Sequence, residues 1–328
     1  MRALLTRVRR KVASIRGNGS SVRRSWGWVA LVLPVLLLVT QLAACGGSST
    51  PSASGGGTIS VVAAENFWGS IAAQVGGSHV QVTNIISSPD TDPHDYEPTS
   101  GDARAFAVAQ YAIVNGAGYD VWAQKALDTN PGGGRKELDV GKLAGRKEGD
   151  NPHMWYSPAI VTRVADQITA DLKSIDAAHA QYFDQQNAAF KTQALKDYSD
   201  LIAAIKATYA GTPVGATESI FEDLAPALGL NLRTSPSLMR AIAEGEDLTA
   251  EDKATMSSQI AGKQIKVLVF NSQNTTSDVN GFVSQARAGG IPIVAITETL
   301  SPAGASFQAW QVAQLQALQS ALAQATGK

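Results

Sequence analysis

Two histidines lie in loops whose sequences suit metal binding. His94 lies in the segment DPHDYEPT, after a predicted strand that ends near Ile86, and His153 lies in NPHMWYSP, just before a predicted helix. Ser157 can cap that helix and Pro158 can begin it. Both histidines are expected at the carboxyl edge of a parallel sheet, where open α/β folds place ligands. A single loop histidine is more often an ordinary polar residue than a ligand, so each needs partners.

Two glutamates occupy equivalent positions in the second half of the chain. Glu218 follows a predicted strand at residues 212–216, and Glu298 follows one at residues 292–297. If they face the two histidines, the set has two nitrogen and two oxygen ligands with a formal charge of −2, which suits a divalent cation. Either glutamate alone could instead be a carboxylate at a helix start that interacts with the dipole, and for Glu218 this alternative is a strong competitor.

The elements around these four residues alternate between short β-rich runs and helical stretches, the pattern of parallel sheets covered on both faces. The predicted strands are residues 59–64, 80–86, 111–115, 137–140, 212–216, 230–234, 266–271 and 292–297. The predicted helices include residues 68–75, 100–109, 158–174, 250–261 and 307–325. The fold class is therefore α/β, with two βα lobes and a parallel sheet in each.

One long helix is predicted between the lobes. Residues 177–209 contain no Gly or Pro, and their large apolar residues recur at helical spacing. Thirty-three residues at a rise of 1.5 Å span roughly 50 Å, longer than one lobe of this size needs. The predicted division is an N-terminal lobe at 58–176, a rigid linking helix at 177–209 and a C-terminal lobe at 210–328.

The first 57 residues predict a lipoprotein signal followed by a tether. The first 44 hold eight of the 27 Lys and Arg residues and no acidic residue, and an apolar run at 29–39 precedes the sequence LAAC. This is the pattern of a signal peptide over 1–44 that ends in a lipobox, too short for a spanning helix. Cys45, the single cysteine, is the predicted lipidation site, and 45–57 is a flexible Gly/Ser-rich tether. A buried thiol in a membrane anchor is the weaker alternative, and Arg23-Arg24 leaves open a twin-arginine export route.

Composition excludes several classes. The 328 residues, 44% hydrophobic, suffice for two domains with sizeable cores. After residue 44 there remain 19 basic and 28 acidic residues, a formal charge of −9 that disfavours a nucleic-acid partner. No Ser-His-Asp order, phosphate-binding glycine loop or Cys/His zinc finger is present, which favours a protein that is not an enzyme.

Several other residues need an interpretation of their own. Asn271 and Gln273 end a predicted strand and can orient a ligand by hydrogen bonds, and Trp155 is the best candidate for a similar role because it neighbours His153. The other two histidines are interpreted as solvated residues, at a turn before a strand and near the start of the long helix. They are His79 and His179.

The chain resembles the metal-binding lipoproteins of ABC importers, the group that contains the periplasmic zinc-uptake and manganese-uptake binding proteins. The resemblance covers about residue 59 to the C-terminus and rests on the motifs DPHDYEP, NPHMW, the Glu218 segment, FNSQ and TETL, in family order. It implies two Rossmann-like βα lobes joined by one long rigid α-helix, with the metal between them. Matched by position, the implied ligands are His94, His153, Glu218 and Glu298.

The implied cargo is one divalent transition-metal ion, manganese or zinc, with iron possible. Zinc-type members usually have a third histidine where this chain has Glu218, and they often have a His-rich loop that is absent here. Oxygen ligands suit Mn(II) or Fe(II), whereas the Irving–Williams order still favours zinc at such a site. The fourth ligand is usually aspartate, so the longer Glu298 leaves its denticity open.

The predicted function is that of an extracytoplasmic solute-binding lipoprotein that captures this ion for an ABC permease. The protein is expected to be a monomer on the outer face of the cytoplasmic membrane, anchored by acylated Cys45, with no nucleic-acid partner. One alternative is a siderophore- or corrinoid-type binding protein with an open cleft. Another is a non-haem iron enzyme that uses two histidines and one carboxylate. An adhesin role, described for some family members, stays open because no sequence feature tests it.

Overall fold

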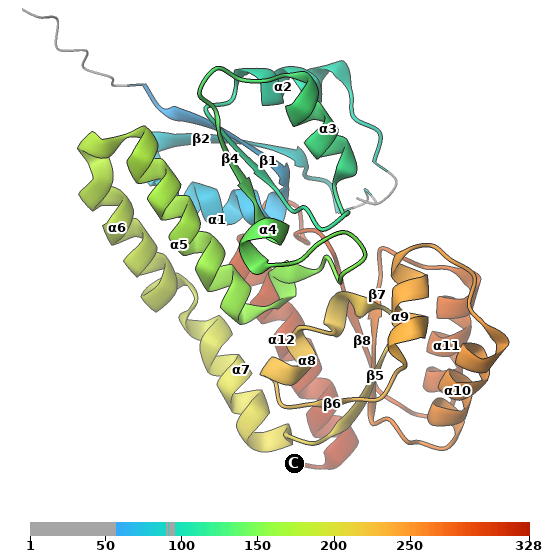
Figure 1. The fold of residues 1–328 in the computed structure, drawn as a ribbon. Helices are drawn as coiled ribbons and strands as arrows, with labels where there is room; N and C mark the ends of the chain where they lie inside the picture. The colour runs from blue at the N-terminus through green and yellow to red at the C-terminus, as the bar shows by residue number, and fades with distance from the viewer. Residues whose placement is uncertain (1–56, 90, 92–95) are drawn as a thin grey trace, which may run out of the picture. The chain divides into compact units, whose positions relative to one another are not determined.

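Two parallel sheets form the framework of the protein. The computed structural model describes residues 57–89, 91 and 96–328, in which eight strands form two four-stranded sheets (Figure 1). The first sheet has the order β2-β1-β3-β4 and the second the order β6-β5-β7-β8, and all pairings are parallel. The strands are β1 (Ile59–Glu65), β2 (Val80–Ile86), β3 (Tyr111–Val114), β4 (Lys136–Asp139), β5 (Pro213–Ala216), β6 (Asn231–Leu232), β7 (Val267–Asn271) and β8 (Ile293–Ile296). This confirms the predicted α/β fold class.

The predicted signal peptide, the tether and Cys45 lie outside the described residues. Among the residues that are described, no helix is both long enough and apolar enough to cross a membrane.

The two central strands of the N-terminal sheet, β1 and β3, are buried on both faces, and their side chains alternate between two separate apolar clusters. Val61 and Ala63 of β1 join the large core, which includes residues of α1 (Asn66–Gly76) and α5 (Pro158–Ile175). Val62 and Ala64 join a separate cluster with α2 (Ser100–Val108) and α3 (Val121–Thr129). A strand covered on both sides is a continuous apolar run, which explains why β1 can be recognised in the sequence.

The C-terminal sheet follows the same principle. Val267 and Val269 of β7 belong to the large core, which also holds residues of α8 (Leu224–Ala227) and α12 (Phe307–Thr326). Leu268, between them, belongs to a cluster formed with α9 (Pro236–Ala243), α10 (Ala250–Ala261) and α11 (Ser277–Ala288). Helices therefore cover both faces of this sheet as well.

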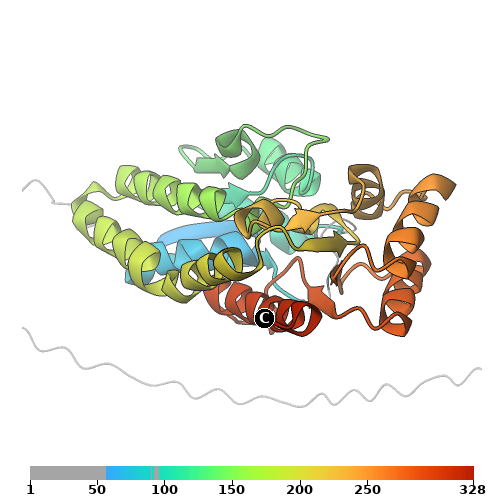
Figure 2. The ribbon, with the colours of Figure 1, turned by 90° about the horizontal axis from the view of Figure 1, so that it is seen from below.

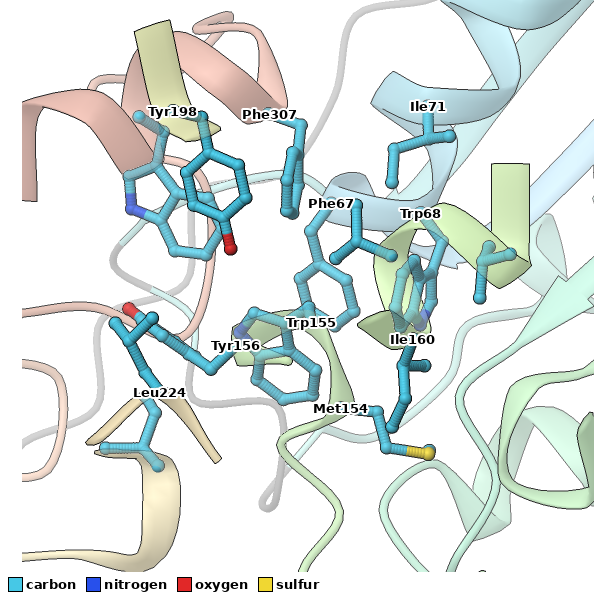
Figure 3. Packing of buried hydrophobic residues seen from close by; sticks show 14 of the residues in the cluster. Phe67, Trp68, Ile71, Met154, Trp155, Tyr156, Ile160, Tyr198, Leu224 and Phe307 are labelled. Atoms are coloured by element: carbon cyan, nitrogen blue, oxygen red, sulfur yellow. The ribbon is translucent and has the colours of Figure 1, made fainter. Parts of the chain in front are cut away.

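One apolar core continues from the N-terminal lobe to helix α12 (Figure 3). Phe67 of α1 stacks on Trp155, with ring centroids 4.0 Å apart and an interplanar angle of 21°. Tyr156, next along the chain, meets Trp310 of α12 edge to face at 5.8 Å. The backbone N–H of Phe307 also donates to the Ser70 hydroxyl, 2.9 Å away. The residues between β4 and α5 are thus packed against both halves of the molecule.

The segment predicted as one long helix is helical along nearly all its length but is not one regular α-helix. It consists of a 3₁₀ turn (Ala177–His179), α6 (Ala180–Ala189), a π-helical turn (Phe190–Ala194) and α7 (Lys196–Tyr209). Phe190 and Leu195, five positions apart, both belong to the large core, and the wider π-turn brings them closer to one face than regular α-helical spacing would. α7 then packs along α12 (Figure 2). The rigidity of this linker and the lobe boundaries stay predictions.

Helix α5 begins next to a predicted metal ligand, and its start differs in one detail from the expectation. Pro158 occupies the first turn and Ser157 the N-cap, but the Ser157 side chain makes no capping hydrogen bond. A 3₁₀ turn, Met154–Tyr156, leads into this helix, and α4 (Val140–Ala144) precedes the loop that carries His153. The proline, with its preset φ, therefore starts the helix without the predicted serine cap.

Candidate metal centre

Three of the four predicted ligands meet in one place. One ligand atom each from His153, Glu218 and Glu298 lie within 4.8 Å of one another, and all three residues are buried, with at most 2% of their surface exposed. The Nε2 atom of His153 lies 3.5 Å from Oε1 of Glu218. His94 lies outside the described residues, so its place in the set stays a prediction.

Parallel strands explain why these residues converge. Glu218 comes two residues after β5, at the N-cap of a 3₁₀ turn (Ser219–Phe221), and Glu298 comes two residues after β8. Because β5, β7 and β8 are parallel neighbours, their carboxyl ends lie at one edge of the sheet. His153 reaches this edge from the loop before the Met154–Tyr156 turn.

Glu298 is held by hydrogen bonds from both lobes. Its Oε1 accepts from the side-chain amide of Asn271 at 2.7 Å, and its Oε2 accepts from the Tyr119 hydroxyl at 2.6 Å. Its backbone N–H donates to Oε1 of Gln273 at 2.6 Å. Asn271 and Gln273, which the sequence suggested as supports, therefore both contact Glu298: Asn271 at its carboxylate and Gln273 at its backbone.

His153 is oriented by Asn151, two residues before it. Oδ1 of Asn151 lies 2.8 Å from Nδ1 of His153 and also accepts from the His153 backbone N–H. The Asn151 amide nitrogen donates to the Ser219 carbonyl and to a carboxylate oxygen of Glu222. These two acceptors identify the other side-chain atom, which faces His153, as the oxygen. Nδ1 of His153 therefore carries the proton, and Nε2, directed at Glu218, is the nitrogen available to a metal.

Trp155 forms an apolar wall of the site. Its ring packs against His153 at 5.2 Å and against Tyr119 at 5.1 Å, and none of its surface is exposed. An apolar wall at this position limits water access and so strengthens the electrostatic attraction between the carboxylates and a cation.

Tyr119 and Asn151 were missed as supporting residues by the sequence reasoning. Tyr119 follows three consecutive residues with positive φ: Gly116 at 71°, Ala117 at 55° and Gly118 at 86°. A β-carbon at Gly116 would lie 2.2 Å from Oδ1 of Asp139, so only glycine fits there. The GAGY sequence after a strand was the one signal for this sharp loop, and it does not reveal what the tyrosine contacts.

Two buried acidic residues, Glu65 and Asp120, lie close to this loop. Burial raises the pKa of Glu65 well above its usual value, and the charge of neighbouring Asp120 raises it further. Burial also raises the pKa of Asp120 to about 6, against the lowering effect of the Gly116 and Asn115 backbone N–H groups that it accepts from. The N-terminal lobe thus holds two buried carboxyl groups with raised pKa values next to the loop that carries Tyr119.

A cleft of about 520 Å³ lies beside the three ligands. Its lining comes from both lobes and includes Tyr119, Asn151, Ser219, Glu222 and Arg240. The ligands themselves do not line it. The cleft therefore reaches the hydrogen-bond partners of Glu298 and His153, while the ligating atoms stay covered.

The arrangement suits a divalent cation. One imidazole nitrogen and two carboxylates give a mixed nitrogen and oxygen set, and the carboxylates carry a formal charge of −2. Their supporting donors hold the ligands in place, as outer partners do in metal sites.

Comparison with known proteins agrees with this chemistry. Residues 61–321 match the family model described as zinc-uptake complex component A, periplasmic. The manganese-binding lipoprotein MntA of Bacillus subtilis is 23% identical over 269 residues, covering 79% of this chain and 86% of that protein. The zinc uptake protein ZnuA of the same organism is 24% identical, covering 50% of this chain and 56% of that one. The chain spans about half the length of most of the curated relatives it matches, including 51% of MntA from Halalkalibacterium halodurans.

Solved structures share the fold. The Mn-bound periplasmic metal-binding protein from Candidatus Liberibacter asiaticus matches with a TM-score of 0.67 at 18% identity, covering 81% of this chain and all of that one. The laminin-binding adhesin Lmb of Streptococcus agalactiae, as a mutant, matches with a TM-score of 0.66 at 17% identity, covering 80% and 99%.

Proposed function

Since the chain belongs to the family of periplasmic zinc-uptake component A, we propose that it is an extracytoplasmic solute-binding lipoprotein that captures a divalent transition metal for an ABC importer. The observation that carries this proposal is the meeting of His153, Glu218 and Glu298 in one buried place. His94 completes the set as the fourth ligand.

The cargo is manganese or zinc, and iron is a third option. With Glu218 in place of a third histidine, the set has two carboxylates, which favours harder ions such as Mn(II). Zinc binds the same ligands more tightly by intrinsic affinity, so the physiological ion depends on supply as well as on the site. Relatives named for manganese and for zinc both support this pair.

Capture follows from charge and burial. The two carboxylates offset the loss of the ion's hydration shell, and neutral His153 presents Nε2 to it because Asn151 holds Nδ1. Tyr119 and Asn271 donate to Glu298 and keep its oxygens directed at the ion. Release then requires small shifts of the loops that carry Glu218 and Glu298, while the lobes themselves move little.

The partners proposed are an ABC permease and the cytoplasmic membrane, to whose outer face acylated Cys45 anchors the chain. The protein acts as a monomer. It is not an enzyme, because four protein ligands around the ion leave little room for a substrate. A non-haem iron enzyme would instead keep positions on the metal open.

Metal uptake by the cell tests this function. Deletion of the gene from its native bacterium is expected to lower uptake of radioactive manganese or zinc, and the wild-type gene to restore it. Glu218→Gln should fail to restore uptake, whereas Glu251→Gln, which changes an exposed carboxylate in the first turn of α10, should succeed. Unchanged uptake after deletion, or restoration by Glu218→Gln, would contradict the proposal.

A further inference from the structure

A second group of metal-binding side chains lies at the opposite end of the N-terminal lobe. One ligand atom each from His79, Asp176 and His179 lie within 4.8 Å of one another, and all three residues are partly buried. Both histidines were interpreted as solvated, and the His179 side chain is indeed 40% exposed. The interpretation missed that their rings are in contact, with centroids 4.0 Å apart. Two of the four histidines of the chain meet here, although they are 100 positions apart in sequence.

Two short turns bring the histidines together. His79 ends the 3₁₀ turn Gly77–His79, just before β2, and His179 ends the 3₁₀ turn that joins α5 to α6. Figure 1 shows the α5–α6 connection at the same end of the N-terminal sheet as the start of β2. Helix α5 has 18 residues, so its two ends are roughly 27 Å apart. His153 precedes one end and Asp176 follows the other, which makes this group independent of the principal site.

The neighbouring contacts hold the group in shape. Oδ2 of Asp176 lies 2.6 Å from Nδ1 of His179. Tyr182 packs against the His79 ring at 4.6 Å, and its hydroxyl accepts from the Ser78 backbone N–H at 3.1 Å. Gly77 permits this approach, because it has a φ of 52° and a β-carbon there would lie 2.1 Å from the Tyr182 oxygen.

From this geometry we propose that His79, Asp176 and His179 form a second binding site for a divalent metal ion of the zinc type. Two imidazoles and one carboxylate are the ligand combination of many three-ligand zinc sites, with water in the remaining position. In a tetrahedral site, adjacent ligand atoms are roughly 3.4 Å apart, and the three ligand atoms here lie within 4.8 Å of one another. The His179 side chain is 40% exposed and that of Asp176 19%, which leaves the ion a direct path from solvent.

The second site differs from the principal one in strength and selectivity. It has three ligands and is open to water, so it binds zinc more weakly than the buried site. Its two nitrogens and single carboxylate favour zinc over manganese, whereas the principal site has two carboxylates. This inference does not depend on the proposed transport function, because it concerns other residues of the lobe.

Nuclear magnetic resonance of the imidazole rings tests the proposal, since the chain has only four histidines. The full chain, labelled with ¹⁵N in histidine and kept soluble with detergent, is titrated with zinc. The first equivalent is expected to change the His153 ring, and the second to move the ring nitrogens of His79 and His179 to metal-bound positions. Magnesium in the same excess should leave both rings unchanged. A second equivalent of zinc that leaves His79 and His179 unaffected, or an equal shift with magnesium, would overturn the proposal.

Variants give an independent measurement. His79→Ala, His179→Ala and Asp176→Asn should each raise the dissociation constant of the second zinc ion roughly tenfold or more, since even outer partners of metal sites contribute that much. Asp184→Asn is the matched control, because Asp184 is an exposed carboxylate on α6 that pairs with Lys173. Second-site affinities in the three variants equal to that of Asp184→Asn would likewise overturn the proposal.

Discussion

The hydroxyl of Tyr119 donates a 2.6 Å hydrogen bond to Oε2 of Glu298, although the two residues are 179 positions apart. Tyr119 comes from the loop after β3 in the first sheet, and Glu298 follows β8 in the second. Asn271 donates to the other oxygen of the same carboxylate. A candidate metal ligand of the C-terminal lobe is thus oriented partly by the N-terminal lobe.

Removing the Tyr119 hydroxyl should weaken metal binding without abolishing it. Tyr119→Phe keeps the ring against Trp155 but leaves Oε2 of Glu298 without this donor. Loss of such an outer partner is expected to lower metal affinity roughly 10- to 100-fold, as measured by competition with a chelator of known affinity. Tyr209→Phe, at the end of α7, is the control and should match the wild type. Equal affinities for the two variants would show that this hydrogen bond does not support the site.

Asn151 should control the tautomer of His153. Asn151→Ala removes the nearer partner of Nδ1 and leaves only the Ser219 hydroxyl, 3.3 Å away, so the ring is held less firmly and metal affinity should fall roughly 10- to 100-fold. The ¹⁵N shifts of the His153 ring in the metal-free protein report the change directly: a protonated Nδ1 in the wild type, and a mixture of tautomers in the variant. Asn280→Ala, at an exposed asparagine of α11, is the control. A ring that stays protonated at Nδ1 in Asn151→Ala would contradict this role.

The buried acid Glu65 should make the metal-free protein less stable as pH rises. Its folded pKa lies above the unfolded value of 4.5, so between the two values the folded chain holds a proton that the unfolded chain has lost. The free energy of unfolding is then highest below 4.5 and falls by about 1.4 kcal/mol per pH unit until the pH passes the folded pKa. Glu65→Gln removes this contribution.

Urea unfolding at a series of pH values, with a chelator present, measures the effect. From pH 5 to 8, Glu65→Gln should lose less stability than the wild type, whereas Glu251→Gln should follow the wild-type curve. Parallel curves for Glu65→Gln and the wild type would mean that Glu65 is not held protonated in the folded protein.

The stacked pair of Phe67 and Trp155 should contribute strongly to stability. Phe67 is fully buried, so Phe67→Ala leaves a cavity against the Trp155 ring and should lower the free energy of unfolding by about 3–5 kcal/mol. Val108→Ala, at a valine that is 68% exposed, should change it by about 0.5 kcal/mol or less. A loss for Phe67→Ala as small as that of the control would show that the core relaxes around the deletion.

Local sequence patterns predicted most of the fold. Strand β2 and helix α10 have the predicted limits, because a half-exposed edge strand and an amphipathic helix each leave a regular pattern in the sequence. Strand β6 has two residues where five were expected, since an edge strand is limited by how far it pairs with its neighbour. The π-turn at Phe190–Ala194 was not predictable, because it depends on which residues the tertiary core accepts.

The candidate site was predictable only in part. Glu218 and Glu298 could be located because residues after parallel strands share one edge of a sheet. The role of Tyr119 could not, since it depends on a contact across 179 positions and on a loop with three positive φ angles. Asn151 contacts His153 locally, but its orientation depends on Ser219 and Glu222, which are far away in sequence. The contact between His79 and His179 was missed for the same reason.

Anomalous scattering from crystals grown with zinc tests the central claim most directly, because it locates the ion independently of any variant. The strongest peak is expected about 2.0–2.2 Å from Nε2 of His153 and from carboxylate oxygens of Glu218 and Glu298, with His94 as the fourth ligand. A map with no peak among these residues, or with zinc only at His79 and His179, would contradict the account.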